Sequence, residues 1–246
     1  MKTVLRVFNL VILVATLAVG IWLWSFLRLF SQDHYVWHQK LSVTMQTPRG
    51  IVSGSSVAEV LAAFGVKPMS QAEVQYGYTG EATVVEVAPG KYLFALLGGT
   101  EERFACAAGP AMNWRGPWFP KPDAKPRGEW LAEIPQMAGQ PPVTVPKECL
   151  PLMVTFGDIT DPKTVQRVDP DDLAASFGPG VSLKAVTLAV TEEPVTEGRV
   201  EAVLGWLAAY NKSQWRLNGE RCISCPVSSA RLADLIDSSD FLIWGK

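Results

Sequence analysis

The sequence EATVVEVAPGKYLFALL, residues 81–97, contains two runs of strand-forming residues separated by a tight turn. Valine, tyrosine, phenylalanine and leucine, which favour strands, dominate both runs. Between them, Pro89-Gly90 suits the centre of a type II turn, because proline sets the first φ angle and glycine accepts the positive second one. The stretch therefore predicts an antiparallel β-hairpin.

A second hairpin is predicted upstream, over residues 41–60. The runs LSVTMQT and IVSGSSVAEV flank a turn that contains Pro48 and Gly50. Alternation of apolar and polar residues on either side of a Pro/Gly turn is typical of paired strands. The stretch VAEVLAAFG, residues 57–65, is expected to be a strand that ends in a helical turn.

Strands and short helices alternate in the C-terminal part of the chain. The runs PLMVTFGDI (151–159) and VSLKAVTLAV (181–190) predict strands. A short helix is expected from Asp169, and the runs VEAVLGWLAAY (200–210) and SARLADLI (229–236) predict two more. Together with the two hairpins, these elements predict an α+β fold: a β-rich domain with a few short helices behind an N-terminal transmembrane helix.

The transmembrane helix is predicted from residues 7–27, VFNLVILVATLAVGIWLWSFL, which contain no charged side chain. About 20 apolar residues are enough to cross the hydrocarbon core of a bilayer. The alternative is a signal peptide cleaved near Ala18-Val19-Gly20. We favour a permanent anchor that contacts the lipid bilayer through residues 7–27, because cleavage there would leave the apolar run IWLWSFLRLF as the new N-terminus.

The predicted anchor divides the chain into an anchor and a folded part. The boundaries are 1–30 for the anchor, 31–108 for a β-rich lobe with two hairpins, 109–146 for a Pro/Trp-rich irregular segment and 147–246 for an α+β lobe. Proline accounts for the irregular segment, since 18 prolines are present in the chain and half of them fall there. Alternatively, residues 31–246 form one continuous domain.

Charge placement predicts the compartment and one class of partner. Lys2 and Arg6 precede the apolar segment, which favours an N-terminus inside the cytoplasm and a folded part on the other side of the membrane. The net charge is −2, with 24 acidic against 22 basic residues. Because an acidic surface repels phosphates, nucleic acid is not expected as a partner.

Three patches of the sequence resemble an uncharacterised group of bacterial single-pass membrane-anchored proteins. The patches are Val154–Val181, Gln39–Ser56 and Tyr92–Leu97. The resemblance implies a bacterial inner-membrane location with a periplasmic C-terminal domain. No activity is assigned to the group, so the resemblance implies no site residues.

The two histidines of the chain, His34 and His38, argue against common catalytic systems. Residues 39–246 provide no imidazole for a Ser-His-Asp or Cys-His system or for a histidine-ligated zinc site. The spacing of the pair would place both rings on one face of a helix, where they could bind a metal or a haem. We favour a pair at the membrane interface on an extension of the anchor helix. No catalytic residue, cofactor or metal is therefore predicted.

The four cysteines are disulfide candidates: Cys106, Cys149, Cys222 and Cys225. Cys106 and Cys149 bracket the proline-rich segment, and we predict that they form a disulfide that closes it. Cys222 and Cys225 form a C-x-x-C motif, which is also compatible with a redox dithiol or half of a metal site. The motif lacks the aromatic and proline neighbours of thioredoxin-like sites, so a structural role is favoured.

Two further groups of side chains suggest recognition or catalysis. The aromatic residues Trp114, Trp118, Phe119 and Trp130 form a possible recognition loop, although such residues also pin irregular loops to a core. The aspartates between Asp158 and Asp172 suggest a calcium site or a carboxylate pair. Turn and cap roles explain them better, because their spacing does not match the calcium-loop pattern.

Three functions remain open at this point. The leading hypothesis is a non-enzymatic, membrane-anchored extracytoplasmic protein that binds another envelope protein or has a structural role. The first alternative is a membrane-tethered thiol-disulfide redox protein that acts through Cys222 and Cys225. The second is a hydrolase that depends on carboxylates or a metal.

Overall fold

The computed structural model describes residues 13–24, 33–64, 74–112, 125, 127–211, 216–220 and 231–243. The chain divides into two compact units. The first comprises Met1–His34 and Ala62–Gln75, and the second comprises Tyr35–Leu61 and Tyr76–Lys246. Every site discussed below lies within the second unit.

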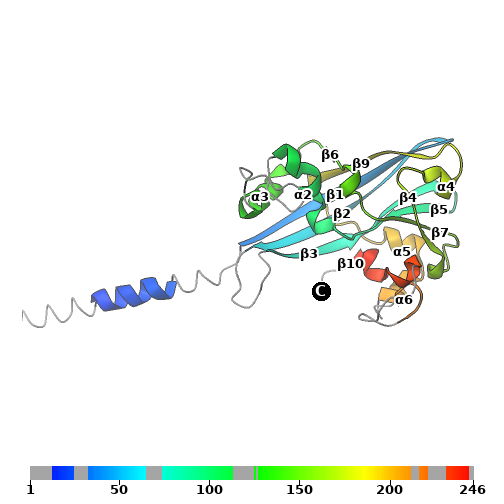
Figure 1. The fold of residues 1–246 in the computed structure, drawn as a ribbon. Coiled ribbons are helices and arrows are strands. Elements are labelled where there is room, and N and C mark those ends of the chain that lie inside the picture. Colours follow the sequence, from blue (N-terminus) through cyan, green and yellow to red (C-terminus); the bar gives the residue numbers. More distant parts are fainter. Residues whose placement is uncertain are drawn as a thin grey trace, which may run out of the picture. The chain divides into compact units, whose positions relative to one another are not determined.

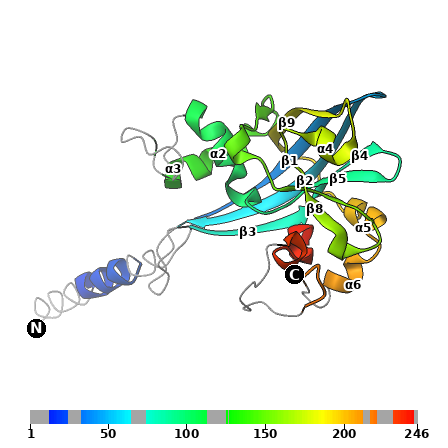
Figure 2. The ribbon, with the colours of Figure 1, turned by 45° about the vertical axis from the view of Figure 1, so that its right-hand side comes forward.

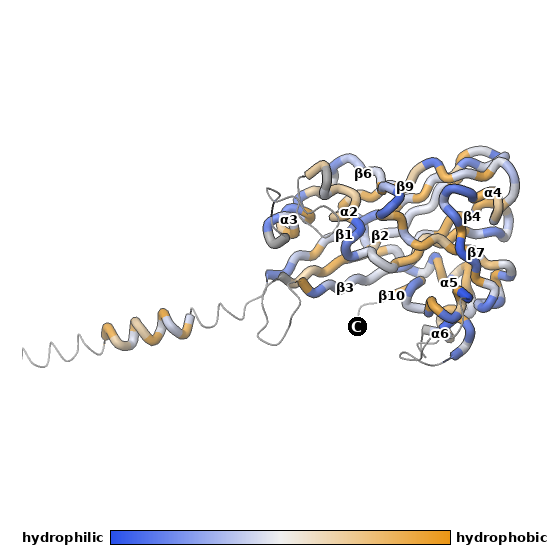
Figure 3. The backbone as a smooth tube through the Cα atoms, in the orientation of Figure 1, coloured by the Kyte–Doolittle hydropathy of each residue, from blue (hydrophilic) through white to orange (hydrophobic). Residues whose placement is uncertain are grey.

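The first unit contains a helix over residues 13–24. Its apolar side chains are exposed, with Leu17 58% and Trp22 64% accessible, and Figure 3 shows its hydrophobic colouring. Within the described residues, no helix combines the length and apolar character that a bilayer crossing requires. The remainder of the predicted 7–27 span lies outside the described ranges.

Two β-sheets account for the strands within the described ranges (Figure 1). The six-stranded sheet has the order β10-β3-β2-β1-β9-β6. Its strands are β1 (Asp33–Thr47), β2 (Gly50–Phe64), β3 (Val74–Glu81), β6 (Val143–Thr144), β9 (Ser182–Thr191) and β10 (Leu242–Ile243). The four-stranded sheet has the order β4-β5-β7-β8. Its strands are β4 (Thr83–Ala88), β5 (Lys91–Ala95), β7 (Met153–Phe156) and β8 (Val165–Arg167).

Short helices connect the strands (Figure 2). The labelled α-helices are α2 (Thr100–Met112), α3 (Arg127–Glu133), α4 (Leu173–Phe177), α5 (Arg199–Val203) and α6 (Leu207–Asn211). The 3₁₀ helices are η1 (Ile134–Met137), η2 (Lys147–Cys149), η3 (Pro162–Thr164), η4 (Leu232–Asp234) and η5 (Ser238–Asp240). The predicted α+β class, β-rich with short helices, is confirmed.

The hairpin predicted over residues 81–97 is confirmed. β4 and β5 pair antiparallel, with Val85 opposite Leu93. Gly90 has a φ of 72°, the left-handed conformation that glycine adopts without steric cost. β5 continues the sheet through pairing of Phe94 with Val154 of β7.

A hydrophobic cluster fills the space between the four-stranded sheet and the C-terminal elements. Phe94 of β5 makes edge-to-face contacts with Phe156 and Phe241 at centroid distances of 5.6 and 5.9 Å. Buried apolar residues of α5 and α6, such as Val200 and Leu207, complete the cluster. Helices as short as α5 and α6 have low intrinsic stability. The burial of their apolar faces in this cluster stabilises them.

The prediction that His34 and His38 extend the anchor helix is wrong. Both lie in β1, which begins at Asp33. β1 pairs antiparallel with β9 from His38 to Gln46. A four-residue spacing places side chains on one face of a strand as well as of a helix, and sheet pairing decides between the two.

Three other local predictions require correction. VAEVLAAFG shows no helical turn in its described part, because β2 continues to Phe64. The helix predicted over residues 200–210 is divided into α5 and α6 around Gly205, a residue that disfavours helix interiors. The helix predicted over 229–236 is reduced, in its described part, to the single turn η4.

The segment 109–146, predicted to be irregular, contains regular elements. α2 runs through its start to Met112, and α3, η1 and β6 lie within it. Three apolar side chains of this segment are 2% exposed or less: Trp130, Leu131 and Ile134. Their burial stabilises helices that the high proline content of the sequence does not predict. The second compact unit includes described residues from both predicted lobes.

Candidate functional site

A groove of about 590 Å³ lies on the face of the six-stranded sheet where β1 and β9 meet. This volume falls within the range of sites that bind small molecules or side chains. Small or polar residues form most of its lining: Lys40, Ser42, Ala138, Gly139, Gln140, Pro142, Thr187, Ala189, Val190, Thr191, Glu192 and Glu193. We call this feature the β1/β9 groove.

The floor of the groove follows from the alternation of side chains along two paired strands. In β1, Leu41 and Val43 are buried in the core, whereas Ser42 between them is partly exposed. Ser42 pairs with Thr187 of β9, and Lys40 pairs with Ala189. Because side chains alternate across a strand, the small and polar residues share the face opposite the core. Their small size leaves the hollow.

One wall of the groove is the connection from η1 to β6. Gly139 donates its backbone N–H to the carbonyl of Val190 at 3.4 Å. Val145 donates to the carbonyl of Val186 at 2.9 Å, after β6 has paired with β9. These bonds attach the wall to the edge of β9. Gly139 has a φ of 80°, which permits the turn at this point.

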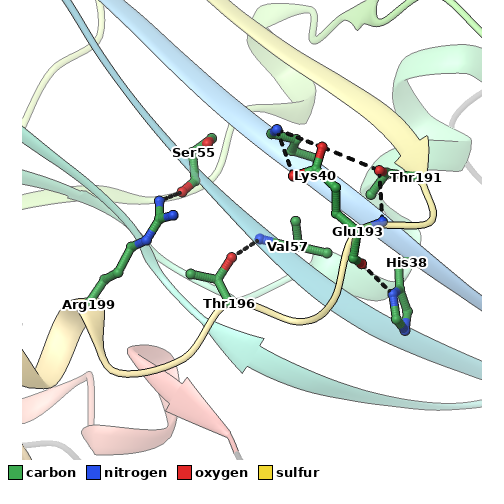
Figure 4. A network of polar contacts seen from close by, with 8 residues as sticks. All are labelled: His38, Lys40, Ser55, Val57, Thr191, Glu193, Thr196 and Arg199. Atoms are coloured by element: carbon green, nitrogen blue, oxygen red, sulfur yellow. Dashed lines mark hydrogen bonds and ion pairs between the residues drawn. The ribbon is translucent and has the colours of Figure 1, made fainter. Parts of the chain in front are cut away.

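The opposite rim carries an ion pair. The Lys40 ammonium donates to both carboxylate oxygens of Glu193, at 2.8 and 2.9 Å (Figure 4). The backbone N–H of Glu193 donates to the Thr191 hydroxyl at 3.1 Å. The hydrogen bond from Lys40 lowers the pKa of Glu193. Because the pair is exposed, it orients Glu193 more than it stabilises the fold.

The rim continues into residues 192–199, which connect β9 with α5 and which we call the strap. Thr196 exchanges two hydrogen bonds with the backbone of Val57 in β2: its N–H donates at 3.0 Å and its hydroxyl accepts at 2.8 Å. Arg199 donates to the carbonyl of Ser55 at 2.8 Å (Figure 4). These contacts hold the strap along β2.

Glu81 fixes the end of the strap. Its buried carboxylate accepts the backbone N–H groups of Arg199 and Val200 at 3.2 and 3.1 Å. These are free donors at the start of α5, so Glu81 caps the helix from another element. Burial raises the pKa of Glu81, and the two backbone hydrogen bonds oppose that effect.

A second polar cluster lies in the interior, at the start of α2. Gln39 donates to the Thr100 carbonyl at 2.6 Å, and Arg103 donates to the Thr100 hydroxyl at 3.1 Å and to the Gly98 carbonyl. Burial lowers the pKa of Arg103 to about 10. The adjoining cavity has only about 10 Å³ open to the centre of a water molecule, so the cluster positions α2 and is too small to bind an organic ligand.

The predicted disulfide is present. Cys106 of α2 and Cys149 of η2 are joined, with Cα atoms 5.9 Å apart and a separation of 43 positions in sequence. Both are 7% exposed. The bond ties α2 to the segment that precedes β7, and therefore closes the proline-rich region as expected.

Most of the other predicted site residues lie outside the described residues. These are Cys222 and Cys225, together with Trp114, Trp118 and Phe119. Trp130 is described and lies in α3 with 2% exposure. It therefore packs in the interior, as a residue that pins a loop would, and does not present a recognition surface.

The aspartates between residues 158 and 172 perform turn and cap roles. Asp158 accepts from Thr160, Asp161 caps η3 through the Lys163 N–H, and Asp172 caps α4 through the Ala175 N–H. Among the described residues, no group of three or more metal-ligating side chains is suited to hold an ion.

Sequence reasoning missed the groove and the strap. In β9, small residues alternate with buried apolar ones: Thr187, Ala189 and Thr191 with Val186, Leu188 and Val190. This alternation could have predicted a strand face lined with small side chains. The contacts of Lys40 with Glu193 join positions 153 apart in sequence. No local pattern predicts such a pair.

Comparisons with known proteins add no relative. No protein-family model matches the chain, and neither the curated proteins nor the solved structures contain a match. The resemblance to bacterial membrane-anchored proteins therefore stays a prediction.

Proposed function

We propose that this chain is a membrane-anchored extracytoplasmic domain that binds another envelope component in the β1/β9 groove. The observation that carries the binding role is the groove itself, which offers about 590 Å³ between a wall hydrogen-bonded to the sheet and a charged rim. Its described lining includes neither histidine nor cysteine. This composition favours binding over nucleophilic catalysis.

Two features support the location. The disulfide between Cys106 and Cys149 is typical of an oxidising compartment outside the cytoplasm. The apolar run at residues 7–27 and the exposed apolar side chains of the helix over 13–24 suit a lipid-embedded anchor. We place the folded part on the periplasmic side of a bacterial inner membrane.

Site-specific photocrosslinking in intact cells tests the binding role. A photoreactive residue at Ser42 or Thr187 on the groove floor should capture a defined neighbour. The same residue at Lys163, an exposed position in η3, serves as the control. A partner captured equally at all three positions, or at none, would contradict a binding function of the groove.

A substitution that fills the β1/β9 groove provides the second part of the crosslinking experiment. Ala189→Trp fills the floor of the groove with a large side chain, whereas Lys184→Trp changes an exposed position of the same strand. We expect Ala189→Trp to abolish the crosslink from Ser42 and Lys184→Trp to leave it unchanged. Circular dichroism establishes that both variants fold.

A further inference from the structure

His38 contacts the strap and the neighbouring strand at the same time. Its Nδ1 lies 2.7 Å from the carbonyl oxygen of Glu193 in the strap (Figure 4). Its Nε2 lies 3.3 Å from the Oε2 of Glu59 in β2. The His38 side chain is 27% exposed and that of Glu59 is 43% exposed, so both remain in contact with solvent protons.

Both partners of the ring are hydrogen-bond acceptors. A backbone carbonyl only accepts, and an ionised carboxylate only accepts. A neutral imidazole has one N–H and one unprotonated nitrogen, so it satisfies one of these contacts and directs a lone pair at the other. The doubly protonated ring donates to both.

The charged groups around the ring come from three elements. Glu59 faces it from β2, Glu193 approaches it from the strap, and Lys40 lies on β1 next to it. Lys40 is paired with Glu193 at 2.8 Å. Glu59 is therefore the carboxylate that faces the protonated ring directly.

We propose that His38 is a protonation-controlled latch, which holds the strap and the rim of the β1/β9 groove more firmly under mildly acidic conditions. Glu193 transmits the effect, because its carbonyl contacts His38 while its carboxylate binds Lys40 and lines the groove. The regulatory meaning of the latch rests on the proposed binding function. The latch itself is a property of the unliganded chain.

The direction of the pH effect follows from the two acceptors. At mildly acidic pH, carboxylates remain ionised while imidazoles take up a second proton, so both contacts form. At alkaline pH the neutral ring keeps one N–H, and when this proton is on Nδ1 only the contact with Glu59 is lost. The bond from Nδ1 to the Glu193 carbonyl in the strap then weakens, because its donor no longer carries a charge. The strap should therefore open more often as the pH rises.

Nuclear magnetic resonance of the full chain in detergent micelles tests the latch without any ligand. The protein has two histidines, so ¹⁵N labelling of histidine gives a simple spectrum in which the exposed His34 is the reference. We expect the two ring nitrogens of His38 to differ from those of His34 at mildly acidic pH. Their proton shifts should show hydrogen bonding that His34 does not share.

Hydrogen exchange of the strap provides the second readout. The amides of Thr196 and Val57 form the bonds between strap and β2. Protection factors are compared, because they correct for the intrinsic pH dependence of exchange. Those of Thr196 and Val57 should be about twofold to fivefold higher at mildly acidic than at alkaline pH, which is the range expected for an exposed ion pair. His38→Gln and Glu59→Gln should abolish that difference, and His34→Gln should preserve it.

The outcomes separate the two proposals. Equal protection at both pH values in the unmodified chain, or an unchanged difference in His38→Gln, overturns the latch. A pH-dependent strap combined with absent crosslinking from Ser42 and Thr187 would leave the latch established and refute the binding function.

Discussion

At the scale of single residues, two positions in the strand region are restricted by their surroundings. Gly54 of β2 lies so close to β4 that an added Cβ would be 2.0 Å from the carbonyl oxygen of Val84. Glu81 carries a buried carboxylate that caps α5. Both positions contribute to holding β2, β4 and the strap in one arrangement, and both can be tested by single substitutions.

Gly54→Ala should destabilise the domain by about 1–3 kcal/mol or more, because the backbone of Val84 has to move to admit the methyl group. Gly77→Ala is the matched control: Gly77 also lies in a strand, and nothing is within 4 Å of an added Cβ there. Urea denaturation measures both. Equal losses of stability in the two variants would contradict the close approach of β2 to β4.

Glu81→Gln should change how the stability of the domain depends on pH. Burial raises the pKa of Glu81, so folding favours its protonated form, and the related stability is lost as the pH rises through the folded-state pKa. The unmodified domain should therefore lose stability relative to Glu81→Gln between acidic and neutral pH. Urea denaturation of both proteins across this range is the measurement, and a constant difference would refute the prediction.

At the scale of elements, the disulfide and the sheet edges determine where the helices lie. Cys106 and Cys149 tie α2 to η2, and backbone bonds from Gly139 and Val145 attach the segment after α3 to β9. The helices in this region are stable because their buried side chains pack under these constraints. Their own propensities contribute less.

Removal of the disulfide should lower the free energy of unfolding by about 4 kcal/mol, the loss expected when a loop of this size is no longer closed in the unfolded chain. The paired substitution Cys106→Ala with Cys149→Ala avoids leaving a lone thiol. Urea denaturation compares it with the oxidised parent chain, and mass spectrometry of a non-reduced digest identifies the crosslinked peptides. Alkylation of Cys106 in the folded, oxidised chain would exclude the bond.

At the scale of the whole molecule, the proposed role requires an anchor helix within the membrane and a folded part on the side of the membrane away from the cytoplasm. The exposed helix over residues 13–24 and the buried disulfide of the second unit are the two supporting observations. Each is local to its own unit.

Val14→Arg combined with Leu17→Arg should release the chain from the membrane. Each arginine near the centre of a transmembrane helix costs about 3 kcal/mol on the insertion scale. The paired control places an arginine at Ile51, which is 63% exposed in β2. Extraction with alkaline carbonate, with immunodetection of the two fractions, measures the outcome. Release of the unmodified chain without detergent, or a cytoplasmic reporter fused at Lys246, would refute the anchored topology.

The sequence alone determined the features that depend on neighbours along the chain. Alternation and turn chemistry over residues 81–97 predict β4 and β5, and Asp161 before η3 is a recognisable cap. The helix expected from Asp169 begins instead at Leu173, because Asp172 is the residue that caps α4. Cysteine placement around the proline-rich segment predicts the disulfide. These predictions succeed because each depends on steric preferences of a few adjacent residues or on the closure of one loop.

Only the tertiary structure decided the conformation of β1 and the existence of the groove. The spacing of His34 and His38 fits a helix face and a strand face equally, and pairing with β9 selects the strand. The groove needs β1, β9 and the η1–β6 connection side by side, and its rim joins Lys40 to Glu193 across 153 positions. Contacts of this range are set by the packing of whole elements, which leaves no periodic trace in the sequence.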